Sequence, residues 1–159
     1  MTDSARTIIG VISDTHGLLR PRALDALRGV EHVIHAGDVG SPDVLAELRR
    51  IAPVTAVRGN TDRGPWAANL RPHELIELAG LRIYPIHDLD HMALDPAELR
   101  LDVVIYGHSH RPAVQRKGSV LYFNPGSAGP KRFKLPITVG ILRIASPDQP
   151  SAEIIHLPE

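Results

Sequence analysis

The chain has 159 residues, and its 18 Lys and Arg balance its 18 Asp and Glu, so the formal net charge is zero. This balance argues against a broad basic surface for nucleic acid, and the absence of cysteine excludes disulfides, thiolate metal sites and cysteine nucleophiles. No apolar run is long enough to span a membrane, and the polar N-terminus lacks the apolar core of a signal peptide. We therefore expect a cytoplasmic protein with a single domain over residues 1–159.

The first third of the chain alternates short apolar strands with helices. Runs rich in β-branched side chains and bounded by turn residues predict strands at residues 7–13, 32–35 and 53–57. Helices are predicted at residues 21–27 and 41–50, because each has a proline in its first turn and the second begins with a capping serine. Such alternation is typical of a parallel sheet with crossover helices.

The second half of the chain is predicted to be mostly β-structure with antiparallel pairing. Turns at residues 79–80 and 117–119 join neighbouring strands as hairpins, and a turn-rich segment at 146–151 precedes the last strand. A short helix is predicted at residues 96–100. The predicted strands are residues 73–78, 81–86, 102–106, 112–116, 120–123, 137–144 and 152–156.

Polar side chains follow the apolar strands at the points where the strands end. Because the carboxyl ends of parallel strands lie at one edge of a sheet, we expect these side chains to converge on one cleft. The seven residues are Asp14, His16, Asp38, Asn60, His87, His108 and His110. The remaining histidines are interpreted as surface or core residues, namely His32, His35, His73, His91 and His156.

This set of side chains points to metal ions. Carboxylates and imidazoles without a thiolate suit Mn²⁺, Fe²⁺, Ni²⁺, Zn²⁺ or Co²⁺. A single tetrahedral zinc ion takes four ligands, so seven residues are too many for one ion and suit two ions that share a carboxylate. The sequence therefore predicts a centre for two divalent ions.

The order of these motifs resembles that of the calcineurin-like metallophosphoesterases, whose signature is D-x-H, G-D, G-N-H-D/E, G-H and G-H-x-H. The matching segments are Asp14-Thr15-His16, Gly37-Asp38, Gly59-Asn60-Thr61-Asp62, His87 and Gly107-His108-Ser109-His110. The short chain and the segment at 124–127 are similar to the small bacterial and archaeal phosphodiesterase branch. The resemblance implies an α/β fold in which two mixed β-sheets pack as a sandwich flanked by helices, in four α/β/β/α layers.

The resemblance also implies a ligand set and a reaction. One metal would take Asp14, His16, Asp38 and His110, and the other would take Asp38, Asn60, His87 and His108, with Asp38 bridging. Mn²⁺ is the ion we favour. A bridging hydroxide would attack a phosphodiester, with Asp38, Asn60 and His108 as the catalytic residues.

The sequence departs from the family pattern at two positions. Thr61 stands where many members have the histidine proposed as general acid, so we expect rates that depend on the leaving group unless another group replaces that acid. Asp62, which would orient that histidine, is expected to hold a loop or a ligand histidine. Asp88 stands where glycine often follows the histidine, and it could orient His87.

The substrate is a small phosphate ester whose identity the residues do not name. Candidate binding residues are Asn60, Arg63, Lys131 and Arg132, whereas Trp66 is interpreted as a core cap. Three alternatives stay open: a phosphomonoesterase, a non-catalytic protein-interaction scaffold of the same fold, and a nuclease. The zero net charge disfavours the nuclease. A homo-oligomer is also possible.

Overall fold

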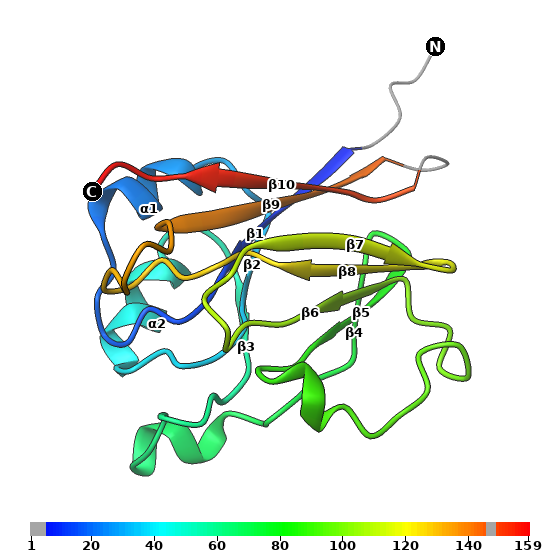
Figure 1. The fold of residues 1–159 in the computed structure, drawn as a ribbon, viewed down its shortest axis with the longest axis horizontal. Coiled ribbons are helices and arrows are strands. Elements are labelled where there is room, and N and C mark those ends of the chain that lie inside the picture. Colours follow the sequence, from blue (N-terminus) through cyan, green and yellow to red (C-terminus); the bar gives the residue numbers. More distant parts are fainter. Residues whose placement is uncertain (1–5, 146–148) are drawn as a thin grey trace.

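Two five-stranded β-sheets form the framework of the protein (Figure 1). The computed structural model describes residues 6–145 and 149–159, so the first half of the predicted 146–151 turn lies outside the described residues. The first sheet has the order β10-β9-β1-β2-β3 and the second has the order β4-β5-β6-β8-β7. The predicted pair of mixed sheets is confirmed.

Each sheet combines three neighbouring parallel strands with two strands that pair antiparallel. In the first sheet, β1 (Arg6–Ile12), β2 (His32–His35) and β3 (Val54–Ala56) are parallel, and β9 (Thr138–Ala145) and β10 (Ser151–His156) are antiparallel. In the second sheet, β5 (Leu81–Pro85), β6 (Val103–Ile105) and β8 (Val120–Asn124) are parallel. The two edge strands, β4 (Ile76–Leu78) and β7 (Ala113–Lys117), pair antiparallel with β5 and β8.

The main core lies between the two sheets. Alternate residues of β1 face opposite sides of the sheet, so Ile9 and Val11 point into this interface while Ile12 packs on the helix side. From the second sheet, Ile105 and Phe123 meet them, and all of these side chains are fully buried. The sheets are therefore held together by apolar packing.

Helices α1 (Pro21–Ala26) and α2 (Pro42–Arg49) cover the outer face of the first sheet (Figure 1). Both begin at a proline, a residue that the first turn of a helix accommodates. At the start of α2, the Ser41 hydroxyl accepts a hydrogen bond from the Asp43 N–H at 3.2 Å. Their buried side chains include Leu45 and Leu48. No helix in residues 6–145 and 149–159 is long and apolar enough to cross a membrane.

The outer face of the second sheet differs from the prediction. Residues 96–100 form a turn, so the predicted helix there is wrong. The Leu99 N–H bonds the Asp95 carbonyl, whereas the Leu101 N–H bonds the Pro96 carbonyl, and this change of spacing does not propagate a helix. The layer is instead built from turns and the single 3₁₀ turn η2 (Leu89–His91). A second 3₁₀ turn, η1 (Pro65–Asn69), places Trp66 against the helix-side core.

The predicted strand at 73–78 is shorter in the structure. Only Ile76–Leu78 pairs as a strand within the predicted 73–78, and His73 forms an isolated bridge with Ile86. The hairpin that follows is confirmed, because Ala79 and Gly80 both have positive φ, at 53° and 81°, as a two-residue type I′ turn requires.

Gly140 lies where the two sheets approach each other closely. A Cβ at this position would overlap the Phe123 ring, so Gly140→Ala should lower the free energy of unfolding by about 1–3 kcal/mol. Urea unfolding measures the loss. Adding Phe123→Leu removes the overlapping ring atoms, so the double variant should lose less than the sum of the single variants. Strictly additive losses would show that the contact between Gly140 and Phe123 is not the constraint.

Candidate metal centre

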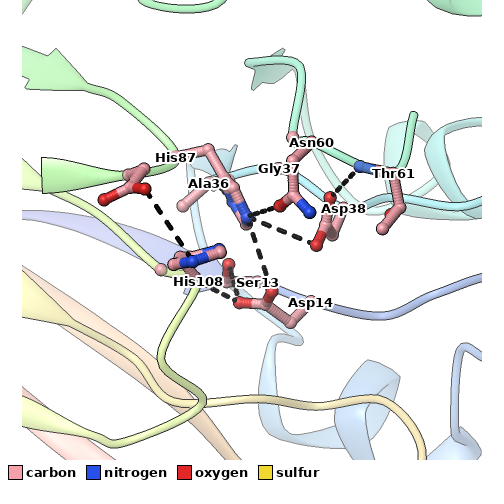
Figure 2. Close-up of polar contacts among 12 residues, drawn as sticks. Ser13, Asp14, Ala36, Gly37, Asp38, Asn60, Thr61, His87 and His108 are labelled. Atoms are coloured by element: carbon pink, nitrogen blue, oxygen red, sulfur yellow. Dashed lines mark hydrogen bonds and ion pairs between the residues drawn. The ribbon is translucent and has the colours of Figure 1, made fainter. Parts of the chain in front are cut away.

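The loops that follow five parallel strands meet at one edge of the sandwich. Asp14 and His16 follow β1, Asp38 follows β2 and Asn60 follows β3, all from the first sheet. His87 follows β5, and His108 and His110 follow β6, from the second sheet. Figure 2 shows side chains from both sheets facing one another across this junction. The predicted convergence of strand ends therefore joins two sheets rather than one.

The backbone at this edge is bent into a rarely used conformation. Five of the seven predicted ligands have left-handed φ values: Asp14 56°, His16 48°, Asp38 54°, His108 73° and His110 64°. Asp and His enter this region more readily than most residues, yet each such position costs on the order of 1 kcal/mol. Strain of this kind is typical of functional sites, and here it turns the side chains toward the junction of the sheets.

The two carboxylates share one pattern of contacts. Oδ2 of Asp14 accepts hydrogen bonds from the Ser13 hydroxyl at 2.6 Å and the His108 N–H at 3.2 Å. Oδ1 of Asp38 accepts one from the Thr61 N–H at 2.9 Å. The second oxygen of each carboxylate faces imidazole nitrogens instead, so each group has one anchored oxygen and one oxygen available to a cation.

Asp14, His16 and His110 form the first group that could hold a metal. Oδ1 of Asp14 lies 3.4 Å from Nε2 of His110 and 3.9 Å from Nε2 of His16. Oδ1 of Asp14 and Nε2 of His16 are buried atoms without a hydrogen-bond partner. Buried polar atoms are nearly always satisfied, so these two atoms fit a bound divalent ion.

Asp14, Asp38 and His87 form the second group. Nε2 of His87 lies 3.3 Å from Oδ2 of Asp38, 3.8 Å from Oδ1 of Asp14 and 3.1 Å from Oδ1 of Asn60 (Figure 2). Nδ1 of His87 donates to the Ala36 carbonyl at 2.7 Å, which directs Nε2 toward the carboxylates. Metal-ligating histidines usually have this second contact, so the group fits an ion as well.

Burial and neighbouring groups shift the pKa values of the ionisable side chains in opposite directions. Burial raises the pKa of Asp14, but hydrogen bonds from His110 and Ser13 outweigh it, and the net pKa is lowered. Burial also raises the pKa of Asp38, but contacts with His87 and Thr61 outweigh burial, and the net pKa lies far below the ordinary value. The pKa of His87 is raised, because Asp38 and Asp14 outweigh its own burial. Both carboxylates are therefore anionic, as metal ligands must be.

Asp62 ties two loops of the centre together. Its carboxylate accepts hydrogen bonds from the N–H groups of Val39 at 3.2 Å, Gly40 at 2.9 Å and Gly59 at 2.9 Å. Asp62 thus holds the loop that carries Asp38 against the loop that carries Asn60. The expectation that Asp62 holds a loop in the absence of a histidine at position 61 agrees with these contacts.

His35 is a supporting residue that the sequence analysis missed. The Thr15 hydroxyl donates to the Val39 carbonyl at 2.8 Å, so Nε2–H of His35, 3.0 Å away, must donate to Thr15. Nδ1 accepts from the Gly37 N–H at 3.1 Å. Burial lowers the pKa of this fully buried ring to about 4. Its position two residues before Gly37-Asp38 was the available signal.

Other predicted site residues lie farther from the two groups. His108 is half-exposed, and its Nε2 lies 3.8 Å from a carboxylate oxygen of Asp88. Asp88 thus faces His108 and, also at 3.8 Å, His91, rather than His87 as expected. Lys131 contacts the Glu159 carboxylate.

A cavity of about 390 Å³ adjoins the second group. Asn60 and His87 line it, so it opens directly onto the proposed ligands. The predicted substrate residues Arg63, Lys131 and Arg132 are not among its lining residues. The other residues around the cavity are Arg58, Gly59, Pro72, His73, Ile86, Asp88 and His91. Sequence reasoning had assigned His73 and His91 to the surface or core and had not considered Arg58.

Comparison with known proteins gives a consistent picture. Residues 8–147 match the calcineurin-like phosphoesterase superfamily domain. A probable metallophosphoesterase of Methanothermobacter thermautotrophicus is 39% identical over 94% of this chain and 92% of its own length. A phosphodiesterase of Methanocaldococcus jannaschii is 32% identical over 84% of this chain and 91% of its own length. The structure of vacuolar protein sorting 29 from Cryptosporidium parvum has the same fold, with a TM-score of 0.76 at 16% identity over 97% of this chain and 99% of its own.

His35 predicts a component of the pH dependence of stability. The unfolded residue binds a proton below about pH 6.5, whereas the folded residue binds one only below about pH 4. The unfolded state therefore gains protons first as the pH falls through this window, and the free energy of unfolding drops by on the order of 3 kcal/mol. Urea unfolding in EDTA at a series of pH values measures this, because EDTA removes any effect of metal release.

The matched variants separate His35 from the other ionisable groups. His35→Gln keeps a donor toward Thr15 without the titration, so its stability should change less between pH 6.5 and 4 than that of the wild type. His156→Gln, at the exposed end of β10, should keep the wild-type slope. Equal slopes for the wild type and His35→Gln would mean that His35 contributes nothing to this dependence.

Proposed function

The chain belongs to the calcineurin-like phosphoesterase superfamily, and we propose that it is a divalent-metal-dependent phosphodiesterase acting on a small phosphate ester. One observation carries this proposal. Asp14 and Asp38 each have one oxygen anchored by hydrogen bonds and a second oxygen that faces histidine Nε2 atoms. Such paired, incompletely satisfied carboxylates are the usual ligands of two-metal phosphoesterases.

The proposed ligand assignment follows the family motifs. Asp14, His16, Asp38 and His110 hold one ion, and Asp38, Asn60, His87 and His108 hold the other. Asp38 as the shared ligand is supported by its Oδ2, which lies 3.7 Å from Nε2 of His16 and 3.3 Å from Nε2 of His87. Oδ1 of Asp14 also faces His87 at 3.8 Å. Mn²⁺ is the ion that we favour, and Ni²⁺, Fe²⁺, Zn²⁺ and Co²⁺ suit the same ligands.

When bound, two divalent ions would supply a hydroxide nucleophile at neutral pH and offset the charge of the phosphoryl group. The protein itself orients the substrate. The Asn60 amide NH₂ can donate to a phosphoryl oxygen while its carbonyl oxygen faces His87. The adjoining cavity offers space for one ester group of a diester.

Two alternatives have less support. A phosphomonoesterase would use the same ligands, but the phosphodiesterase named among the relatives favours a diester. A non-catalytic scaffold has the support of the fold shared with vacuolar protein sorting 29. A scaffold, however, has no need for buried, unsatisfied atoms such as Oδ1 of Asp14 and Nε2 of His16.

Metal removal and Asp38→Asn test the proposed reaction. The metal-free protein should be inactive toward bis(p-nitrophenyl) phosphate, and Mn²⁺ should restore hydrolysis that exceeds hydrolysis of p-nitrophenyl phosphate. Asp38→Asn removes a ligand charge and should lower kcat/KM by at least about 100-fold. Asp25→Asn is the matched control, because Asp25 is an exposed residue of α1 paired with Arg28. Hydrolysis that survives both EDTA and Asp38→Asn would refute the proposal.

A further inference from the structure

The proposed reaction needs a proton for the leaving group, and Thr61 cannot provide it. An alkoxide leaves far more readily when a positioned acid protonates its oxygen in the transition state. The Thr61 hydroxyl does not ionise in a useful pH range, and the backbone N–H of Thr61 is bound to Asp38. A proton donor must therefore come from another residue beside the centre.

The cavity next to the second group contains a candidate. Its lining includes Asn60, His87, Asp88 and His91, so a group bound at the proposed ligands and extending into the cavity can approach the largely exposed ring of His91. His91 ends η2, and its N–H donates to the Asp88 carbonyl at 3.0 Å. The Asp88 side chain caps the same turn, because its Oδ1 accepts from the Asp90 N–H at 3.0 Å. Both residues are thus fixed by one short turn.

The second carboxylate oxygen of Asp88 lies near both His91 and the proposed metal ligand His108. Oδ2 of Asp88 lies 3.8 Å from Nε2 of His91 and 3.8 Å from Nε2 of His108. The two imidazole nitrogens therefore lie no farther apart than twice that distance. His108 is a proposed metal ligand, and His91 lines the cavity into which an ester group held there would extend.

We propose that His91, oriented by Asp88, is the general acid for the ester group that occupies this cavity. Asp88 faces Nε2, so the transferable proton is on Nδ1, for which no hydrogen-bond partner occurs among the described residues. As the bond between phosphorus and the leaving oxygen breaks, its electron pair stays on that oxygen. The oxygen takes the Nδ1 proton, and an alcohol and a neutral imidazole result. The inference rests on the proposed phosphodiesterase function.

Other charged and ionisable groups around the cavity do not offer the same arrangement. Arg58 offers guanidinium N–H donors, which suit binding of an anion. His73 lines the cavity too, but its ring stacks on Tyr84 at 5.5 Å between centroids, and no ion pair joins it to a carboxylate in the described part of the chain. His73 is therefore the matched control for His91, since both are cavity histidines and only one has an acidic partner.

The dependence of rate on the leaving group tests this assignment. The Mn²⁺-loaded enzyme is assayed on methyl aryl phosphates whose phenols range from p-nitrophenol to unsubstituted phenol, and on a dialkyl ester. With an acid in place, log kcat/KM of the wild type should fall only gently as the leaving-group pKa rises. If no other residue replaces the acid that Thr61 lacks, log kcat/KM should fall steeply as the leaving-group pKa rises.

Substitution of His91 should steepen this dependence. His91→Gln should lower kcat/KM by about 100-fold or more for the phenyl and alkyl esters and by a much smaller factor for the p-nitrophenyl ester. Asp88→Asn should change the slope in the same direction, because it removes the partner that orients the acid. His73→Gln should leave the slope as in the wild type. Thr61→His introduced into His91→Gln should restore part of the lost rate on poor leaving groups.

Two results would overturn the inference in distinguishable ways. If His91→Gln and His73→Gln show the wild-type slope while the wild type hydrolyses the esters, His91 is not the acid and the phosphodiesterase proposal stands. If the Mn²⁺-loaded wild type hydrolyses none of the esters, both proposals fail. Metal content and thermal unfolding of each variant show whether a changed slope reflects loss of the fold or of the ions.

Discussion

Two carboxylates in a shared buried space dominate the structure of this protein. Asp14 is fully buried and Asp38 is 3% exposed, and their unanchored oxygens both face His87. Two like charges at such depth are destabilising unless hydrogen bonds and positive charge compensate them. The N–H groups of Thr61 and His108 and the surrounding imidazoles supply part of this compensation. Divalent ions would supply the rest.

Much of the local structure serves to bring these carboxylates together. The parallel strands of both sheets end at one edge, and left-handed backbone at the ligand positions turns the side chains inward. Glycine is required where loops cross, because a Cβ at Gly37 would lie 2.6 Å from Nδ1 of His87. Asp62 and His35 hold these loops by accepting hydrogen bonds from the N–H groups of Gly40 and Gly37. The apolar contacts between the sheets thus set the positions of the polar groups.

A fold does not by itself imply catalysis, so the fold shared with vacuolar protein sorting 29 is no argument for a reaction. The arguments for a reaction come from the atoms at the strand ends. Among the described residues, His16 of the first group has a buried ring nitrogen without a partner, and the cavity beside Asn60 adjoins the second group through His87. These features fit the proposed ions and the proposed ester substrate.

Sequence reasoning succeeded where a residue's role depends on its neighbours in the chain. Apolar strands followed by Asp, Asn or His predicted both the strands and the convergence of these side chains. Sequence reasoning failed where the role depends on tertiary contacts. Residues 96–100 were predicted as a helix, and in the structure they form a turn. His35 and His91 were ordinary histidines in sequence, and only the partners Thr15 and Asp88, brought near by folding, distinguish them.

Anomalous diffraction from crystals soaked in Mn²⁺ is the most direct test of the central claim that these carboxylates hold two ions. We expect two peaks about 3.5–4 Å apart, one beside Asp14, His16 and His110 and the other beside Asp38 and His87. Both peaks should disappear or weaken in crystals of Asp38→Asn. A saturated soak with a single peak, or with peaks only on surface carboxylates, would contradict a two-metal centre in this protein.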